Sequence, residues 1–181
     1  MTRATAAGFT LIELLIVIAL IAILGGMTVP TIAAGMRRYE VISASQQVAS
    51  TIRSARYQAV AKNRSLRLRF DCPAAGQYRL IEFTGTPAID DAADRCDTAA
   101  YAFPDANGAT LPNLDGPVQF LPQNMQFGAF SSLQIDASGR IARLTGCPTC
   151  TTAAAPATIV VSNSYGTSTI TVSASGQVNL P

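Results

Sequence analysis

The sequence contains no histidine and no tryptophan among its 181 residues, and its formal net charge is only +2. Without histidine the chain lacks the commonest acid–base side chain and the commonest protein metal ligand, which excludes a Ser-His-Asp catalytic set. A net charge so close to zero gives no indication of an anionic partner. No glycine-rich phosphate loop and no pair of catalytic carboxylates stand out either. We therefore expect neither an enzyme nor a cofactor or metal site.

The chain does have one long apolar run, from Phe9 to Val29, in which Glu13 is the only charged residue among 21. A helix of that length reaches about 32 Å, and the hydrocarbon core of a bilayer is about 30 Å thick. A cleaved signal peptide has a shorter apolar core, so Ala33-Ala34-Gly35 is a poor candidate for its cleavage site. The pattern predicts a leader at residues 1–8 and a transmembrane helix at residues 9–29.

Glu13 is the informative residue of this run. A carboxylate inside a membrane span costs about 3 kcal/mol and indicates a functional role with a partner. If the peptide bond after Gly8 were cut, Phe9 would carry a new α-amino group. The Glu13 carboxylate of one subunit could then pair with the Phe9 ammonium of a neighbour. The alternative is a tolerated charge near a helix end, whose side chain extends to the membrane interface.

The segment Gly8-Phe9-Thr10-Leu11-Ile12-Glu13-Leu14-Leu15 resembles the prepilin-peptidase site of type IV pilins and type II secretion pseudopilins. The resemblance implies cleavage by the prepilin peptidase after Gly8 and N-methylation of Phe9. It also implies that Glu13 assists assembly with other pilins or pseudopilins in a fibre.

Residues 30–63 continue the helix in amphipathic form, because Val41, Val48, Ile52, Ala55 and Ala59 recur on one helical face. Residues 64–181 are expected to form a β domain. The strands are predicted at 65–70, 78–83, 118–121, 125–127, 133–135, 141–144, 158–161, 169–172 and 178–180. A long irregular stretch at 84–117, with one short strand at 101–103, separates the second strand from the third. The predicted fold is α+β: a long N-terminal helix packed on an antiparallel β-sandwich.

Three later features narrow the resemblance to the GspH/FimT family of minor pseudopilins and minor pilins. They are the helix end at residues 52–63, the segment Ile135-Asp136-Ala137-Ser138-Gly139-Arg140, and the closing strand-turn-strand at 158–180. The resemblance implies a structural subunit of a type II secretion pseudopilus. Such a subunit is held in inner-membrane lipid by a single span, with its C-terminal domain in the periplasm, and joins the fibre after assembly. The alternative is a minor pilin of a type IV pilus that takes part in DNA uptake.

The four cysteines are Cys72, Cys96, Cys147 and Cys150. An even count after an export-type N-terminus indicates disulfides. Of the three pairings, we favour Cys72 with Cys96 and Cys147 with Cys150. The Cys147-Pro148-Thr149-Cys150 segment also resembles a redox motif, but the residues after it make a poor start for the helix that such a motif needs. A zinc site would need a second close cysteine pair.

The charged residues are unevenly distributed. Eight basic residues against one acid lie between Arg37 and Arg69, and eight acids against two basic residues lie between Asp71 and Asp115. The basic stretch could bind phosphate or lipid headgroups, but internal pairing with the acidic stretch, or with a neighbouring subunit, is favoured. Leu66, Leu68 and Phe70 alternate with Arg67 and Arg69, which predicts a half-buried strand with one basic face.

The remaining binding hypotheses concern DNA and calcium. Family members in DNA-uptake pili resemble this chain, and in them a Gly-Arg-any-Arg motif near the C-terminus is implicated in DNA binding. The matching turn here, residues 175–179, contains no arginine. Arg140 and Arg143, in an earlier hairpin, nearly match this motif, but the second arginine stands one position too far along the chain. In a strand that shift places the two side chains on opposite faces, so DNA binding is not favoured. The acidic residues at 90, 91, 94 and 97 lack an EF-hand pattern and are interpreted as a solvated loop.

Overall fold

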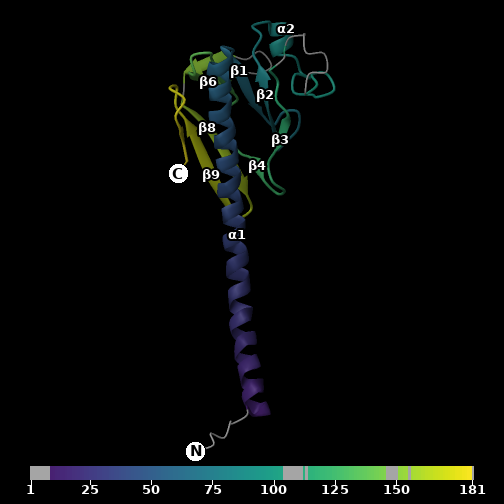
Figure 1. The fold of residues 1–181 in the computed structure, drawn as a ribbon, viewed down its shortest axis with the longest axis vertical. Helices are drawn as coiled ribbons and strands as arrows, with labels where there is room; N and C mark the ends of the chain where they lie inside the picture. The colour runs from purple at the N-terminus through teal and green to yellow at the C-terminus, as the bar shows by residue number, and fades with distance from the viewer. Residues whose placement is uncertain (1–8, 104–111, 113, 146–150, 155, 181) are drawn as a thin grey trace, which may run out of the picture. The chain divides into compact units, whose positions relative to one another are not determined.

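The computed structural model describes residues 9–103, 112, 114–145, 151–154 and 156–180 (Figure 1). The chain divides into two compact units, residues 1–38 and residues 39–181. The first unit contains the start of the long helix α1, which begins at Leu11 and ends at Lys62. The second contains the rest of α1 and the β-strands. The predicted long N-terminal helix is therefore confirmed.

Asn63 terminates helix α1, and backbone hydrogen bonds cap the helix end. This residue has φ of +51°, and its N–H donates to the carbonyl oxygen of Val60 at 3.2 Å. The Arg64 N–H donates to the carbonyl oxygen of Ala59 at 3.0 Å. These two bonds satisfy carbonyl groups that a helix C-terminus would otherwise leave unpaired. The chain then turns directly into the first strand.

The strands form two antiparallel sheets. Their bounds are β1 Leu66–Phe70, β2 Gln77–Glu82, β3 Val118–Phe120, β4 Gln126–Phe127, β5 Leu133–Ile135, β6 Ile141–Thr145, β7 Thr151–Ala154, β8 Ala157–Asn163, β9 Gly166–Val172 and β10 Val178–Asn179. One sheet has six strands in the order β3-β2-β1-β5-β6-β7, and the other has four in the order β10-β9-β8-β4. The arrangement is the predicted sandwich-like α+β fold.

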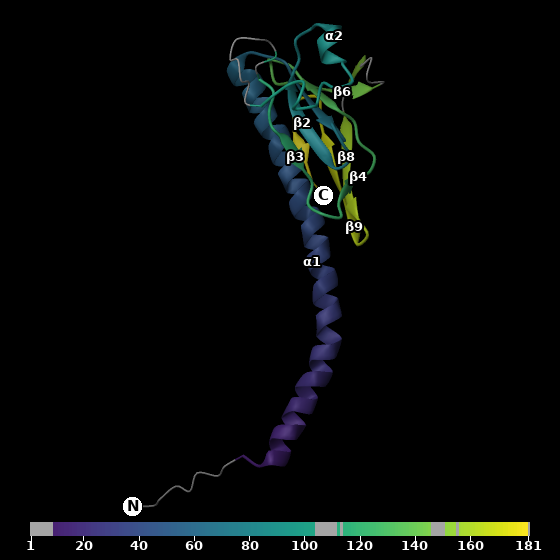
Figure 2. The same ribbon diagram turned by 90° about the vertical axis from the view of Figure 1, so that its right-hand side faces the viewer.

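A single hydrophobic core joins the helix to both sheets, and the two views in Figures 1 and 2 show the C-terminal half of α1 lying against the strands. All five residues of the predicted helical stripe are buried in it. Phe70 faces Tyr78 across β1 and β2, and the Phe127 ring of β4 meets both aromatic rings edge-on. These aromatic contacts close the space between the two sheets.

Two four-residue turns have nearly the same sequence and the same conformation. Asp136-Ala137-Ser138-Gly139 joins β5 to β6, and Ser173-Ala174-Ser175-Gly176 joins β9 to β10. Each ends in a glycine with φ near +80°, which a residue without Cβ adopts at little cost. In each, that glycine's N–H donates to the carbonyl oxygen of the first turn residue, at 2.9 Å. We call these two segments the twin turns.

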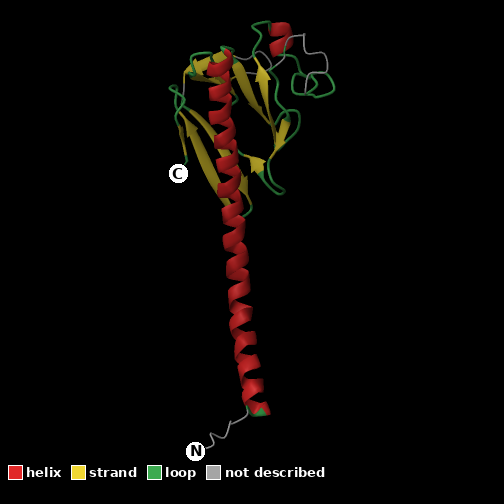
Figure 3. Cartoon of the chain, viewed as in Figure 1, coloured by secondary structure: helices red, strands yellow, loops and turns green. Residues whose placement is uncertain are grey.

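The structure differs from the sequence-based predictions in three elements, as the distribution of helix and strand in Figure 3 shows. A short helix, α2 (Pro87–Asp90), lies in the stretch predicted to be irregular. The predicted short strand at residues 101–103 is wrong, since these residues form a bend without ladder bonds. Strand β7 was not predicted, because Thr151–Ala154 carries no alternation of apolar and polar residues, although it pairs with the preceding strand β6.

Candidate assembly and binding sites

The N-terminal end of α1 is capped by Thr10. Its Oγ1 accepts the N–H of Glu13 at 3.3 Å, and its carbonyl oxygen accepts the N–H of Leu14 at 3.2 Å. Thr10-Leu11-Ile12-Glu13 matches the capping-box pattern, in which the acid of the first turn also favours the positive end of the helix dipole. The Glu13 side chain is exposed. Glu13 therefore combines a helix-start position with a carboxylate that a neighbouring chain can reach.

The first turns of α1 expose large apolar side chains on all sides. Phe9 is 82% exposed, and eleven leucine, isoleucine and valine residues from Leu11 to Leu24 are also exposed. A surface this apolar in water needs lipid or other protein to cover it. Among the described residues, no helix meets the length and apolarity required of a membrane span. Gly8, the predicted cleavage residue, lies outside the described residues, so the processing and assembly roles of Gly8, Phe9 and Glu13 stay predictions.

The predicted basic face of β1 is covered by protein. Arg67 is only 5% exposed, and its Nη1 pairs with Asp91 Oδ1 at 2.9 Å. Its Nε donates to Gln134 Oε1 at 3.0 Å, and its guanidinium lies 4.3 Å from the centre of the Phe83 ring. The predicted half-buried strand is thus wrong at Arg67, which is buried, whereas the favoured pairing with the acidic stretch is present in the contact with Asp91. Alternation along a strand shows that the two faces differ, but it does not show that a distant loop covers the second face.

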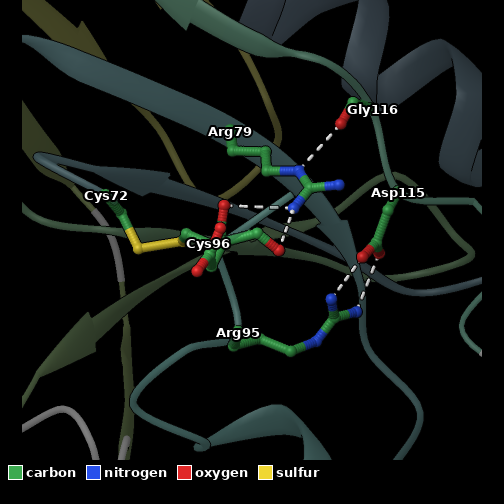
Figure 4. Close-up of a disulfide and its surroundings, with 7 residues drawn as sticks. Cys72, Arg79, Arg95, Cys96, Asp115 and Gly116 are labelled. Carbon is green, nitrogen blue, oxygen red and sulfur yellow. Dashed lines mark hydrogen bonds and ion pairs between the residues drawn. A yellow bond between two sulfur atoms is a disulfide. The ribbon is translucent and has the colours of Figure 1, made fainter. Parts of the chain in front are cut away.

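Arg79 holds that loop by hydrogen bonds to its backbone. The side chain is fully buried, and Nε donates to the Gly116 carbonyl oxygen at 2.8 Å. Nη1 donates to the carbonyl oxygens of Cys96 at 3.1 Å and Asp97 at 3.3 Å, and Nη2 donates to that of Tyr101 at 2.6 Å. Figure 4 shows this guanidinium between Cys96, in the middle of the loop, and Gly116, near its end. Burial lowers the pKa of Arg79 below its ordinary value, and the carbonyl groups compensate its charge.

Arg95 and Asp115 form a second buried contact within the same loop. Arg95 Nη2 donates to Asp115 Oδ1 at 2.7 Å, and Nη1 contacts the other carboxylate oxygen, which makes the pair bidentate (Figure 4). Asp115 Oδ1 also accepts the N–H of Glu82 at 2.8 Å, and Arg95 Nη2 donates to the Glu82 carbonyl oxygen at 3.0 Å. The pair therefore ties the loop to the end of β2.

The predicted disulfide between Cys72 and Cys96 is present, and it links residues 24 positions apart in the sequence. Cys72 follows β1, and Cys96 lies in the loop that Arg79 holds, so the bond fastens that loop to the sheet (Figure 4). Cys147 and Cys150 lie outside the described residues, and their pairing stays a prediction.

Several side chains of the acidic stretch between Asp71 and Asp115 are engaged internally. Arg64 pairs with Glu82 at 3.5 Å, and Arg67 pairs with Asp91, so internal pairing of the basic stretch is confirmed for these residues. Asp90 is buried, and its Oδ1 accepts the N–H and the hydroxyl of Thr84 at 2.9 and 3.0 Å. The interpretation of this cluster as a solvated loop is therefore wrong for Asp90. In the described part of the chain, no group of three or more acidic or cysteine residues is placed to hold a metal.

Arg140 and Arg143 lie in different environments. Arg140 is exposed at the end of the first twin turn, whereas Arg143 is half-buried in β6 opposite Leu133. Arg143 Nε is buried and has no hydrogen-bond partner among the residues that the structure describes. The two side chains therefore do not offer one shared surface of equal accessibility. Their role in phosphate binding stays a prediction.

The structure places two helix arginines at the twin turns, which sequence reasoning missed. Arg56 Nε donates to the Gly139 carbonyl oxygen at 2.8 Å, and a Cβ built on Gly176 would lie 2.5 Å from that Nε. Arg53 Nη2 donates to the Val178 carbonyl oxygen at 3.1 Å. The repeated Ala-Ser-Gly of the two turns was visible in the sequence, but its proximity to α1 depends on how both sheets pack on the helix.

Asp136 organises the first twin turn. Its Oδ1 accepts the N–H groups of Ser138 and Arg140, each at 2.9 Å, and the Ser138 hydroxyl at 2.7 Å. Burial alone would raise the pKa of Asp136, but these hydrogen bonds and the charge of Arg140 outweigh it and lower the pKa below its ordinary value. The carboxylate is therefore held in its charged form within the turn.

Comparisons with known proteins match two family models. Residues 3–29 match the prokaryotic N-terminal methylation motif, and residues 44–176 match the type II transport protein GspH. A comparison with curated proteins finds no match. Among solved structures, the type IV minor pilin FimU of Pseudomonas aeruginosa aligns at 15% identity and a TM-score of 0.48, over 80% of this chain and 90% of that chain. The minor pseudopilin EpsH of Vibrio cholerae aligns at 12% identity and a TM-score of 0.46, over 78% of this chain and 96% of that chain.

Proposed function

Because the chain belongs to the type II transport protein GspH family, we propose that it is a minor pseudopilin, a structural subunit of a type II secretion pseudopilus. The rival within the same fold is a minor pilin of a type IV pilus. The role is assembly by non-covalent packing, and the chain carries out no bond chemistry of its own. The observation that carries this proposal is the exposed apolar start of α1, which lies within the match to the N-terminal methylation motif.

In this proposal residues 9–29 hold the precursor in the inner membrane, with residues 64–181 in the periplasm. The prepilin peptidase removes residues 1–8, and Phe9 becomes the methylated N-terminus. Support comes from the length of the apolar run and from the exposure of its side chains. In the fibre these side chains pack against the corresponding helices of other pseudopilins, so that protein replaces lipid around them.

Glu13 supplies the polar contact in that otherwise apolar packing. Its carboxylate is exposed in the first turn of α1, near the position where cleavage creates the Phe9 ammonium. Between helices, where the dielectric is low, an unpaired carboxylate is costly and a paired one is stabilised. A subunit joining the fibre can therefore pair its Glu13 with the Phe9 ammonium of its neighbour, which favours one axial position of the two helices.

The experiment compares Glu13→Ala, Thr10→Ala and Gly8→Val in the secreting cell. Glu13→Ala should be cleaved normally, as the mature mass shows, but should enter the sheared fibre fraction at about a tenth of the wild-type amount or less, consistent with a lost pair of roughly 1.5 kcal/mol or more in this environment. Thr10→Ala removes the cap and keeps the carboxylate, so incorporation should be largely retained. Gly8→Val should block cleavage, so the chain should keep the mass of the uncleaved precursor.

Two outcomes contradict these roles. Normal incorporation of Glu13→Ala into the fibre would contradict the proposed pairing of Glu13 with Phe9. Cleavage of Gly8→Val to the normal mature mass would contradict the proposed cleavage site. Absence of the wild-type chain from sheared pseudopili, together with its presence in type IV pili, would favour the rival. The specific test of the DNA-uptake reading is a titration with duplex DNA over a salt series, since phosphate contacts weaken steeply with salt.

A further inference from the structure

We propose that the face of the periplasmic domain around the twin turns binds a carboxylate-bearing surface of another fibre subunit. We define this twin-turn surface by Arg53, Arg56, Tyr57, Val60 and Arg140. The inference rests on the proposed function for the location of the partner, and it adds the place and the chemistry of the contact.

The surface is continuous because its residues contact the same two turns. Arg56 lies against both turn glycines, and Val60 lies beside the first, since a Cβ built on Gly139 would be 3.0 Å from Val60 Cγ2. Arg140 follows Gly139 directly, and Arg53 reaches the strand after the second turn. Tyr57 adjoins Arg53 and Arg56 on the outer face of α1 and is 75% exposed. A partner can therefore contact all five residues at once.

The arginines of this surface are oriented by the backbone and are available to an external anion. Arg53 and Arg56 each donate one hydrogen bond to a backbone carbonyl oxygen, which orients the guanidinium, and both residues are exposed. Among the described residues, the ion pairs involve other arginines, and none includes Arg53, Arg56 or Arg140. Asp136 is the acid beside Arg140, and the hydrogen bonds of its own turn occupy Oδ1. Three arginines against one carboxylate leave the surface positive.

The composition favours a protein partner over a nucleic acid. Arginine and tyrosine are enriched in protein–protein interfaces, and exposed apolar groups such as Tyr57 and Val60 contribute through burial of their surface. A guanidinium with free donors matches the two oxygens of a carboxylate. Affinity for nucleic acid grows with the number of phosphates neutralised, and three arginines with one neighbouring acid can neutralise only a few, so DNA binding should be weak. The surface thus fits a carboxylate set beside an apolar side chain.

The test uses the full chain in detergent micelles with three fluorescent probes: poly-L-glutamate, a glutamate–tyrosine copolymer and duplex DNA. The wild-type chain should bind both polypeptides in a salt-sensitive way, the copolymer more tightly, and DNA more weakly than either. Arg53→Gln with Arg140→Gln should weaken binding of both polypeptides about tenfold, because each exposed charge pair contributes modestly. Tyr57→Ser should make the affinity for the glutamate–tyrosine copolymer equal to that for poly-L-glutamate.

Two features keep this test decisive. Arg56 is retained in the double variant, so the twin turns keep their hydrogen bond, and an unchanged melting temperature will verify the fold. Lys62→Gln removes an exposed cation from the same helix outside the surface and should change binding less than twofold. No binding by the wild-type chain, tighter binding of DNA, or an equal loss in Lys62→Gln would each overturn the proposal.

The same double variant separates this proposal from the proposed function. Cells carrying it should cleave the precursor to the normal mass but incorporate less of the chain into sheared fibres. Normal incorporation would reject the subunit contact even if the polypeptides bind. If the wild-type chain is absent from fibres altogether, the proposed function fails, whereas binding of the glutamate polymers would still establish the surface as a carboxylate-binding site.

Discussion

Arg56 and Gly139 are joined by a hydrogen bond across 83 residues of sequence, with 2.8 Å between the guanidinium Nε and the carbonyl oxygen. The same side chain lies against Gly176, so one residue of α1 contacts the turns of both sheets. The helix, the six-stranded sheet and the four-stranded sheet therefore meet at a single guanidinium, and its loss affects all three.

Gly176→Ala should be more destabilising than an ordinary change at a left-handed glycine. At φ of +81° an added Cβ costs about 1–2 kcal/mol, and here it would also lie 2.5 Å from Arg56 Nε and displace that side chain. The matched control is Gly85→Ala, which has φ of +78° and open space around its Cβ. Urea unfolding should show a larger loss for Gly176→Ala than for Gly85→Ala. In an Arg56→Ala background this difference should disappear; if it persists, Arg56 is not the obstacle.

Asp115→Ala should lower the free energy of unfolding by about 3–5 kcal/mol, because it leaves the buried Arg95 guanidinium without its charged partner. Arg95→Met combined with Asp115→Leu should recover much of that loss, since it removes both buried charges. Arg64→Ala breaks the pair with the buried Glu82, but the Arg64 side chain is 53% exposed and water screens its charge, so the loss should be smaller than for Asp115→Ala. Chemical unfolding of the three variants gives the comparison, and equal losses for Asp115→Ala and Arg64→Ala would contradict it.

Asp136 should make the stability of the domain depend on acid pH. Its folded-state pKa lies below the ordinary value of 3.8, so its stabilisation is complete above that value and is lost as the pH falls through the folded-state pKa. Asp136→Ala should therefore lower the melting temperature at neutral pH and narrow its difference from wild type in acid. Ser138→Ala, which removes one hydroxyl donor, should have the same sign and a smaller size. A constant difference across pH would argue against the charged carboxylate as the cause.

Local pattern was sufficient for α1 and most of the strands. Val41, Val48 and Ile52 repeat with the period of a helix, and their burial follows because one helical face must leave water. The disulfide between Cys72 and Cys96 was also predictable, since few pairings of four cysteines compete. Strand β7 and helix α2 were missed because neither has a periodic apolar pattern over enough residues.

The sequence by itself determined the apolar start of α1, the amphipathic continuation and the alternating strands, because each depends on neighbours one to seven residues apart. Only the tertiary structure decided that a loop covers the basic face of β1, so that Arg67 is buried instead of exposed, and that Arg79 of β2 is buried beneath the same loop. It also decided that Arg56 meets both twin turns. These contacts join residues tens of positions apart, and they depend on how the loop, the two sheets and the helix pack together, which no local period encodes.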